Sequence, residues 1–168
     1  MEHDGAAWRR GSGAALGFAR AITEDVTVLV LGEGIAAMTA EAAKFAPALA
    51  ADNAALVDPV ADRWAHVIAE VVRTHKAELV VATATTWAKD IVGRAAGLLG
   101  GALASDVIGP ELKEGELRLR RPMFAGAIIG TITLKGSPQI ITVRPSVYEI
   151  PHTAPTPLAH KAVAVDVR

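Results

Sequence analysis

Two turns in the sequence carry residue types that could bind a ligand. The first follows the apolar run 78–83, which ends at Thr83, and contains Thr85, Thr86, Lys89 and Asp90. Hydroxyl groups, an ammonium group and the N-terminus of the helix that follows could hold a phosphate or a ribose. The same residues also fit helix capping alone, with Thr86 as the N-cap and Asp90 in the first turn. Both interpretations stay open.

The second turn has the spacing Gly32-x-Gly34-x-x-Ala37, between an apolar run and a helical pattern, with Asp52 about 20 residues further on. Glycines would let the backbone approach a pyrophosphate, and the carboxylate would accept a ribose hydroxyl. Glu33 places a negative charge inside this loop, which argues against a phosphate there. We therefore weigh a dinucleotide site against a purely structural turn.

Catalytic chemistry has little support in the sequence. It shows no nucleophile elbow, no phosphate-binding loop of the Walker type and no acid–base pair. Cysteine is absent, so disulfides, iron–sulfur clusters and thiolate zinc sites are excluded. The histidines lack metal-ligand spacing; they are His3, His66, His75, His152 and His160. We predict no catalytic residue and no metal site, and expect a carrier module more readily than an enzyme.

The elements around the first turn form a strand–helix–strand unit. Residues 78–83 are a short, unbroken apolar run of the kind found in buried parallel strands. Helix 87–99 has one apolar face and ends at Gly100-Gly101, and a strand follows at 102–105. The rest of this half alternates in the same way, with strands at 26–31 and 48–52 and helices at 13–22, 35–45 and 59–75.

After Asp106 the pattern changes to strands and turns, at 116–121, 126–134 and 139–143. The glycine and proline of segment 135–138 favour a hairpin between the last two. We expect a small antiparallel extension on a doubly wound, mostly parallel sheet. Its arginines either protect an exposed sheet edge or dock an acidic partner surface; they are Arg118, Arg120, Arg121 and Arg144.

Several short motifs, in order, resemble the amino-terminal domain of the electron transfer flavoprotein alpha subunit, over roughly residues 2–148. These motifs are Thr85-Thr86-Trp87-Ala88-Lys89-Asp90, Arg94, Ser105-Asp106-Val107, Arg121-Pro122, Phe124-Ala125-Gly126 and Thr142-Val143-Arg144-Pro145. The resemblance implies an adenine nucleotide alpha hydrolase-like α/β fold. It also implies a domain at 1–148 and a proline-rich linker at 149–168, with a possible C-terminal strand.

The resemblance further implies a function in electron transfer. Such a domain docks a beta subunit and positions a separate FAD domain, and dehydrogenases are met only through the assembled protein. We expect this chain alone not to retain FAD. AMP binding through either turn stays possible, as does a purely protein-binding assembly domain, and the chain could also form a homo-oligomer. A cytoplasmic or organelle-matrix location is expected.

The sequence departs from the family pattern in two respects. Family members usually have Gly-Arg-Asp where this chain has Ala88-Lys89-Asp90. They also have a strand before the segment that matches residues 2–5 and a second, FAD-holding domain, and neither is in the sequence. We expect either a truncation or another segment in the place of that strand, and the alternating run 161–168 is a candidate.

Composition sets the remaining limits. The 168 residues are enough for one domain with a real core. Hydrophobic residues make up 51% but aromatics only 4%, so Ala, Val, Leu and Ile must fill that core. A net charge of -1 gives no reason to expect nucleic acid as a partner. No apolar run approaches the roughly 20 residues of a membrane span.

Overall fold

The structure, a computed structural model, describes residues 2–5, 7–9, 11–154 and 156–167. The helices are α1 (Gly13–Arg20), α2 (Ala36–Ala42), α3 (Ala61–His75) and α4 (Thr86–Leu99), with short 3-10 turns η1 (Ala54–Leu56) and η2 (Phe124–Gly126). The strands are β1 (Val28–Gly32), β2 (Ala48–Asp52), β3 (Leu79–Thr83), β4 (Ala102–Val107), β5 (Gly109–Lys113), β6 (Glu116–Met123), β7 (Ile128–Thr133), β8 (Gln139–Val143) and β9 (His160–Ala162).

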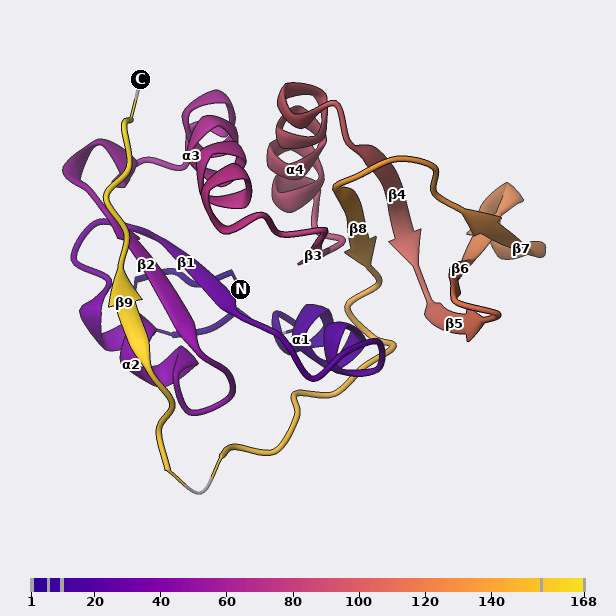
Figure 1. Ribbon diagram of the computed structural model, residues 1–168, viewed down its shortest axis with the longest axis horizontal. Helices are drawn as coiled ribbons and strands as arrows, with labels where there is room; N and C mark the ends of the chain where they lie inside the picture. Colours follow the sequence, from indigo (N-terminus) through magenta and orange to yellow (C-terminus); the bar gives the residue numbers. More distant parts are fainter. Residues whose placement is uncertain (1, 6, 10, 155, 168) are drawn as a thin grey trace.

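The strands form two parallel sheets and one antiparallel sheet (Figure 1). The parallel sheets have the orders β1-β2-β9 and β3-β8-β4, and the antiparallel sheet has the order β5-β6-β7. Figure 1 shows the antiparallel sheet at one end of the long axis of the molecule, beyond β4. The expected α/β class, mostly parallel with an antiparallel extension, is confirmed.

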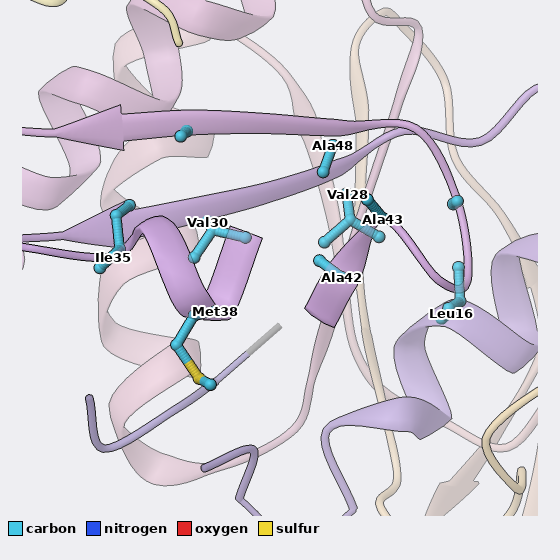
Figure 2. Close-up of a cluster of buried hydrophobic side chains, with 10 residues drawn as sticks. Leu16, Val28, Val30, Ile35, Met38, Ala42, Ala43 and Ala48 are labelled. Carbon is cyan, nitrogen blue, oxygen red and sulfur yellow. The ribbon is translucent and has the colours of Figure 1, made fainter. Parts of the chain in front are cut away.

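Helices cover both faces of the parallel strands, because successive strand residues point to opposite sides. In β1, Val28 and Val30 pack on the side of α2, while Leu29 and Leu31 pack with the buried cluster of α3 and α4. Figure 2 shows the first side, with Met38 and Ala42 of α2 against Val28 and Val30. Small alanines at these contacts let helix and strand approach closely, as the aromatic-poor composition predicts.

The predicted hairpin between 126–134 and 139–143 is wrong. β8 pairs in parallel with β3 on one side and with β4 on the other, so it lies at the centre of its sheet. Its residues Ile140–Val143 are all buried. A strand that is buried on both faces gains more from a central parallel position than from a tight turn to its neighbour in sequence.

The antiparallel sheet is built differently from the prediction. β5, at 109–113, was not expected, and it pairs with β6 across the turn at Glu114-Gly115, where both residues have positive φ. β6 extends through Met123, and β7 pairs only with β6. The antiparallel extension is therefore β5-β6-β7, and segment 135–138 leads out of it into the parallel sheet.

The C-terminal run contributes a short strand at the periphery. β9 pairs in parallel with β2, on the side away from β1. The expectation that 161–168 occupies a place near the centre of the sheet is therefore wrong, and position 168 lies outside the described residues. Beyond β9, Val163, Val165 and Val167 pack on the α3 cluster, and this apolar contact holds the run at the edge.

Among the described residues, no helix combines the length and the apolar character needed to cross a membrane.

Candidate functional site

The two predicted turns lie at the carboxyl ends of β1 and β3, and the N-terminal segment links them. The ring Nε2 of His3 is 2.9 Å from the carbonyl oxygen of Leu31, at the end of β1. The Glu2 carboxylate accepts a hydrogen bond of 2.8 Å from the Thr85 hydroxyl, after β3. A candidate site at this edge is therefore bounded by the first residues of the chain, which the sequence had not indicated.

Thr85, and not Thr86 as predicted, caps α4. Its side-chain oxygen accepts a hydrogen bond of 3.0 Å from the amide of Ala88, and its backbone is extended, as at an N-cap. The hydroxyl donates its one proton to Glu2. The carboxylate of Glu2 thus lies where the helix N-terminus would attract an anionic ligand.

An open pocket of about 530 Å³ adjoins this cap. Its lining residues are Glu2, Arg9, Thr85, Thr86 and Trp87. Two of the four residues predicted at this turn, Thr85 and Thr86, are therefore together, and the pocket adds a carboxylate and a guanidinium of opposite charge. Any ligand here would compete with Glu2 for the Thr85 hydroxyl.

Lys89 and Asp90 do not line that pocket. Both are exposed on the first turns of α4, and Asp90 forms an i,i+4 ion pair with Arg94, with 3.1 Å between Oδ1 and Nε. Such exposed helical pairs contribute about 0.3–0.5 kcal/mol. The structure thus separates the four predicted residues into a pocket pair and an exposed pair.

The glycine turn is closed by Asp52. One carboxylate oxygen accepts a hydrogen bond of 2.8 Å from the amide of Gly34, and the other accepts a hydrogen bond of 3.1 Å from the amide of Ile35. Gly34 has a φ of 65°, and Gly32 has a φ of 153°. A Cβ atom added to Gly32 would lie only 2.7 Å from the side chain of Ile35. The amide groups that a pyrophosphate would need are therefore bound by the chain's own aspartate, so a dinucleotide would have to displace it.

A second polar cluster lies where β4 and β8 end, around Asp106. Arg144 donates to both carboxylate oxygens, at 3.2 Å from Nε and 2.6 Å from Nη2. The amide of Asp106 donates a hydrogen bond of 3.0 Å to the hydroxyl of buried Thr142, and this hydroxyl donates a hydrogen bond of 3.1 Å to the hydroxyl of Ser105. Asp106 has a φ of 60°, a left-handed conformation that few residues other than glycine, asparagine and aspartate accept. The cluster fixes the irregular end of β4 against β8.

The Arg144 hydrogen bond holds the pKa of Asp106 below its ordinary value of 3.8, and Lys89 and Arg121 add to this effect by their charge. The same pair raises the pKa of Arg144. A fork-shaped guanidinium on a carboxylate is a geometry that favours both charged forms. Arg144 is therefore committed within the chain.

The other predicted docking arginines differ in their partners. The Nε of Arg118 lies 3.6 Å from Glu116, which also binds Lys135 at 3.0 Å. Within the described part of the chain, neither Arg120 nor Arg121 has an ion-pair partner. Arg120 is exposed, and Nε of Arg121 is buried without an acceptor. Of the four arginines, these two form no ion pair among the described residues, and Arg121 acts on Asp106 through its charge alone.

Sequence reasoning missed Glu2 and gave Asp52 a different role. Glu2 is far from Thr85 in the sequence, so no local pattern could pair them. Asp52 ends β2, and parallel pairing of β1 with β2 places Gly32 opposite it. The signal for the contact of Asp52 with the glycine turn was the expected parallel pairing of these two strands, because the carboxyl ends of adjacent parallel strands meet at one edge.

Comparison with known proteins matches residues 1–167 to the family described as electron transfer flavoprotein domain. The chain is 34% identical over 146 residues to the electron transfer flavoprotein subunit alpha of Pseudomonas aeruginosa, covering 85% of this chain and 46% of the relative. The subunit alpha of Bradyrhizobium diazoefficiens is 35% identical over 156 residues, covering 88% and 46%.

Protein FixB of Bradyrhizobium diazoefficiens is 35% identical over 105 residues, covering 61% of this chain and 28% of that protein. The chain thus spans about half the length, or less, of these relatives. The match to the family nevertheless extends over almost every residue described above. The chain belongs to the electron transfer flavoprotein domain family, and its relatives are alpha subunits and FixB proteins.

Proposed function

We propose that this chain is an alpha-subunit-like module of an electron transfer flavoprotein, which docks a beta subunit and holds no nucleotide of its own. In this proposal residues 1–148 form the docking domain, and residues 149–168 form the linker and edge strand toward a flavin domain. The assembled protein would carry electrons between dehydrogenases and an acceptor. The matches to alpha subunits and FixB proteins support this role.

We propose that no nucleotide binds because, in each of the two turns, a carboxylate of the chain is already hydrogen-bonded. Glu2 binds Thr85 beside the N-terminus of α4, and Asp52 binds the amides of Gly34 and Ile35. Each carboxylate is fixed by the fold and occupies a place that a phosphate would take. A nucleotide would bring more negative charge to sites that already contain one, and at 4 Å two like charges repel even in water.

In the family, FAD belongs to the intact alpha subunit, and the residues described here do not offer it a complete site. Thr85 and Thr86 are the groups that would contact its phosphate or ribose, and Thr85 is already bound on both sides. Flavin supplies the redox chemistry when it is bound. The residues of this chain would then contribute position alone.

The test is titration calorimetry of the purified chain with FAD and separately with AMP, together with its visible spectrum. We expect no flavin absorbance after purification and no heat of binding for either nucleotide at concentrations up to about 100 µM, which corresponds to a binding free energy weaker than about -5.5 kcal/mol. Stoichiometric flavin would contradict the proposal, and FAD or AMP binding that a Thr85→Val variant abolishes would establish a ligand site in the pocket of Glu2, Arg9 and Thr86.

The alternative, a dinucleotide bound at the glycine turn, is tested by the same titration with a second variant. Asp52→Asn weakens the competing acceptor at the glycine turn and leaves Thr85 untouched. NAD or FAD binding that becomes tighter in Asp52→Asn would place a dinucleotide at Gly32 and Gly34. The carrier proposal expects no binding in either protein.

A further inference from the structure

The turn between β6 and β7 presents an uninterrupted apolar surface to solvent. All residues from Met123 to Ile129 are exposed, and none is charged or polar in its side chain. Phe124 is 76% exposed, and Ile128 and Ile129 are about half exposed. We call residues 123–129 the apolar tip. Exposed large apolar groups that gather in one place are typical of interaction sites.

The backbone of the apolar tip is also in an unfavourable conformation. Phe124 and Ala125 have φ values of 51° and 54°, and Gly126 has a φ of 92°. A left-handed conformation is rare for a bulky side chain, because its Cβ approaches the following carbonyl oxygen. Glycine would fit at position 124 without this strain. The chain therefore has an exposed phenylalanine at a place where folding alone favours glycine.

The tip is held in a fixed shape. The amide of Ala127 donates a hydrogen bond of 3.1 Å to the carbonyl oxygen of Phe124, and Met123 of β6 lies opposite Ile128 of β7. Met123 packs on Gly130, where a Cβ would come within 2.6 Å of the methionine methyl group. A preformed apolar anchor loses little conformational entropy when it enters a pocket. Figure 1 shows this turn at the outer end of the antiparallel sheet.

The apolar tip is flanked by positive charge on both faces of the sheet. Along β6 the side chains alternate, so Arg120 and Pro122 share one face, and Arg121 and Met123 share the other. Cross-strand pairing places Ile129 beside Pro122. Because both arginines lack an ion-pair partner within the described residues, a complementary surface has carboxylates around an apolar centre.

A second copy of this chain fits that surface poorly. In a two-fold symmetric dimer through the apolar tip, the same patch meets itself. Arg120 and Arg121 of one copy would then approach the same arginines of the other, and like charges across an interface suppress pairing. The charge pattern favours a different protein.

We propose that the apolar tip docks into an apolar pocket rimmed by carboxylates on the beta subunit, with Phe124 as the anchor and Arg120 and Arg121 as its rim contacts. This inference rests on the proposed function, because that function supplies the partner. Aromatic side chains and arginines are the residues that most often carry interface binding energy.

The experiment is a binding titration of the full 168-residue chain with the purified beta subunit of the organism that encodes it. Phe124→Gly removes the anchor and is expected to weaken binding about 30-fold or more. The variant should unfold at the same temperature as the parent or higher, because glycine accepts the positive φ. Arg120→Glu should also weaken binding, and rising salt should weaken the parent's binding.

Matched controls lie on the opposite edge of the same sheet, in β5. Leu112→Ala removes an apolar side chain that is 58% exposed, and Lys113→Glu reverses an exposed charge. Both should change affinity by no more than about twofold, as most residues outside a hot spot do.

The outcomes separate the two proposals. If the parent binds the beta subunit and Phe124→Gly binds equally well, the inference is overturned and the docking function stands. If Leu112→Ala weakens binding as much as Phe124→Gly, the anchor is not at the tip, and the inference is likewise overturned. If the parent does not bind at all, the proposed docking function fails, and the inference falls with it.

Discussion

At the scale of residues, two carboxylates near the predicted ligand turns form hydrogen bonds within the chain. Asp52 was expected to accept a ribose hydroxyl, and it accepts from two backbone amides instead. Glu2 satisfies the hydroxyl of the capping threonine. These intrachain contacts use polar groups at the carboxyl ends of β1 and β3, the edge at which open α/β sheets usually bind ligands.

The ion pair of Asp106 with Arg144 should make stability depend on pH. Because Arg144 lowers the pKa of Asp106 below 3.8 in the folded state, the pair stabilises the fold above that pH. The stabilisation is lost as pH falls through the lowered value. Asp106→Asn removes the charge while keeping a residue that tolerates the left-handed backbone.

We therefore expect Asp106→Asn to unfold at a lower temperature than the parent at pH 7, and at the same temperature near pH 2. Thermal unfolding followed by circular dichroism across this range measures the difference. Asp90→Asn, which breaks only the exposed pair with Arg94, is the control and should shift the midpoint very little. A gap between Asp106→Asn and the parent that is equally large at pH 2 would assign the effect to packing and not to charge.

At the scale of elements, the sequence predicted what depends on local pattern and missed what depends on pairing partners. The strands at 48–52 and 139–143 have the predicted bounds, because short β-branched or alanine-rich apolar runs define their own ends. The partner of β8 could not be predicted, since a turn signal at 135–138 favours a hairpin while burial on both faces favours the centre of a parallel sheet. Tertiary burial decided between them.

Two helical glycines have opposite surroundings and should respond oppositely to alanine. A Cβ on Gly17 in α1 would lie 2.7 Å from the carbonyl oxygen of Glu149 and 3.0 Å from Tyr148. Gly97 in α4 has open space around it. Gly17→Ala should lower the free energy of unfolding by about 1–3 kcal/mol through overpacking, and Gly97→Ala should raise it by about 0.5–1 kcal/mol.

Chemical denaturation of the two variants and the parent provides these values. The close contact at Gly17 is the junction of α1 with segment 148–150, so its outcome also tests whether that segment is packed on the domain. If Gly17→Ala is as stable as Gly97→Ala, segment 148–150 does not pack on α1 as described.

At the scale of the whole molecule, the fold class and the family could be predicted from the sequence, and the candidate site could be predicted only in part. The fold follows from alternating apolar runs and helical patterns, and the family follows from the spacing of short motifs such as Ser105-Asp106-Val107. The apolar tip was not predicted, because its exposure depends on where η2 lies relative to the core. Residues 123–134 read as strand and turn whether a partner covers them or not.

If this chain is a docking module without a nucleotide of its own, it should form a complex with a beta subunit and remain colourless when purified separately. The measurement is the molar mass, by light scattering during size-exclusion chromatography with absorbance detection, of the chain mixed with an equimolar amount of the beta subunit. We expect one peak with the mass of a one-to-one complex, and no flavin absorbance from the chain measured separately. Separate peaks for the two proteins, or a chain that carries flavin without its partner, would contradict it.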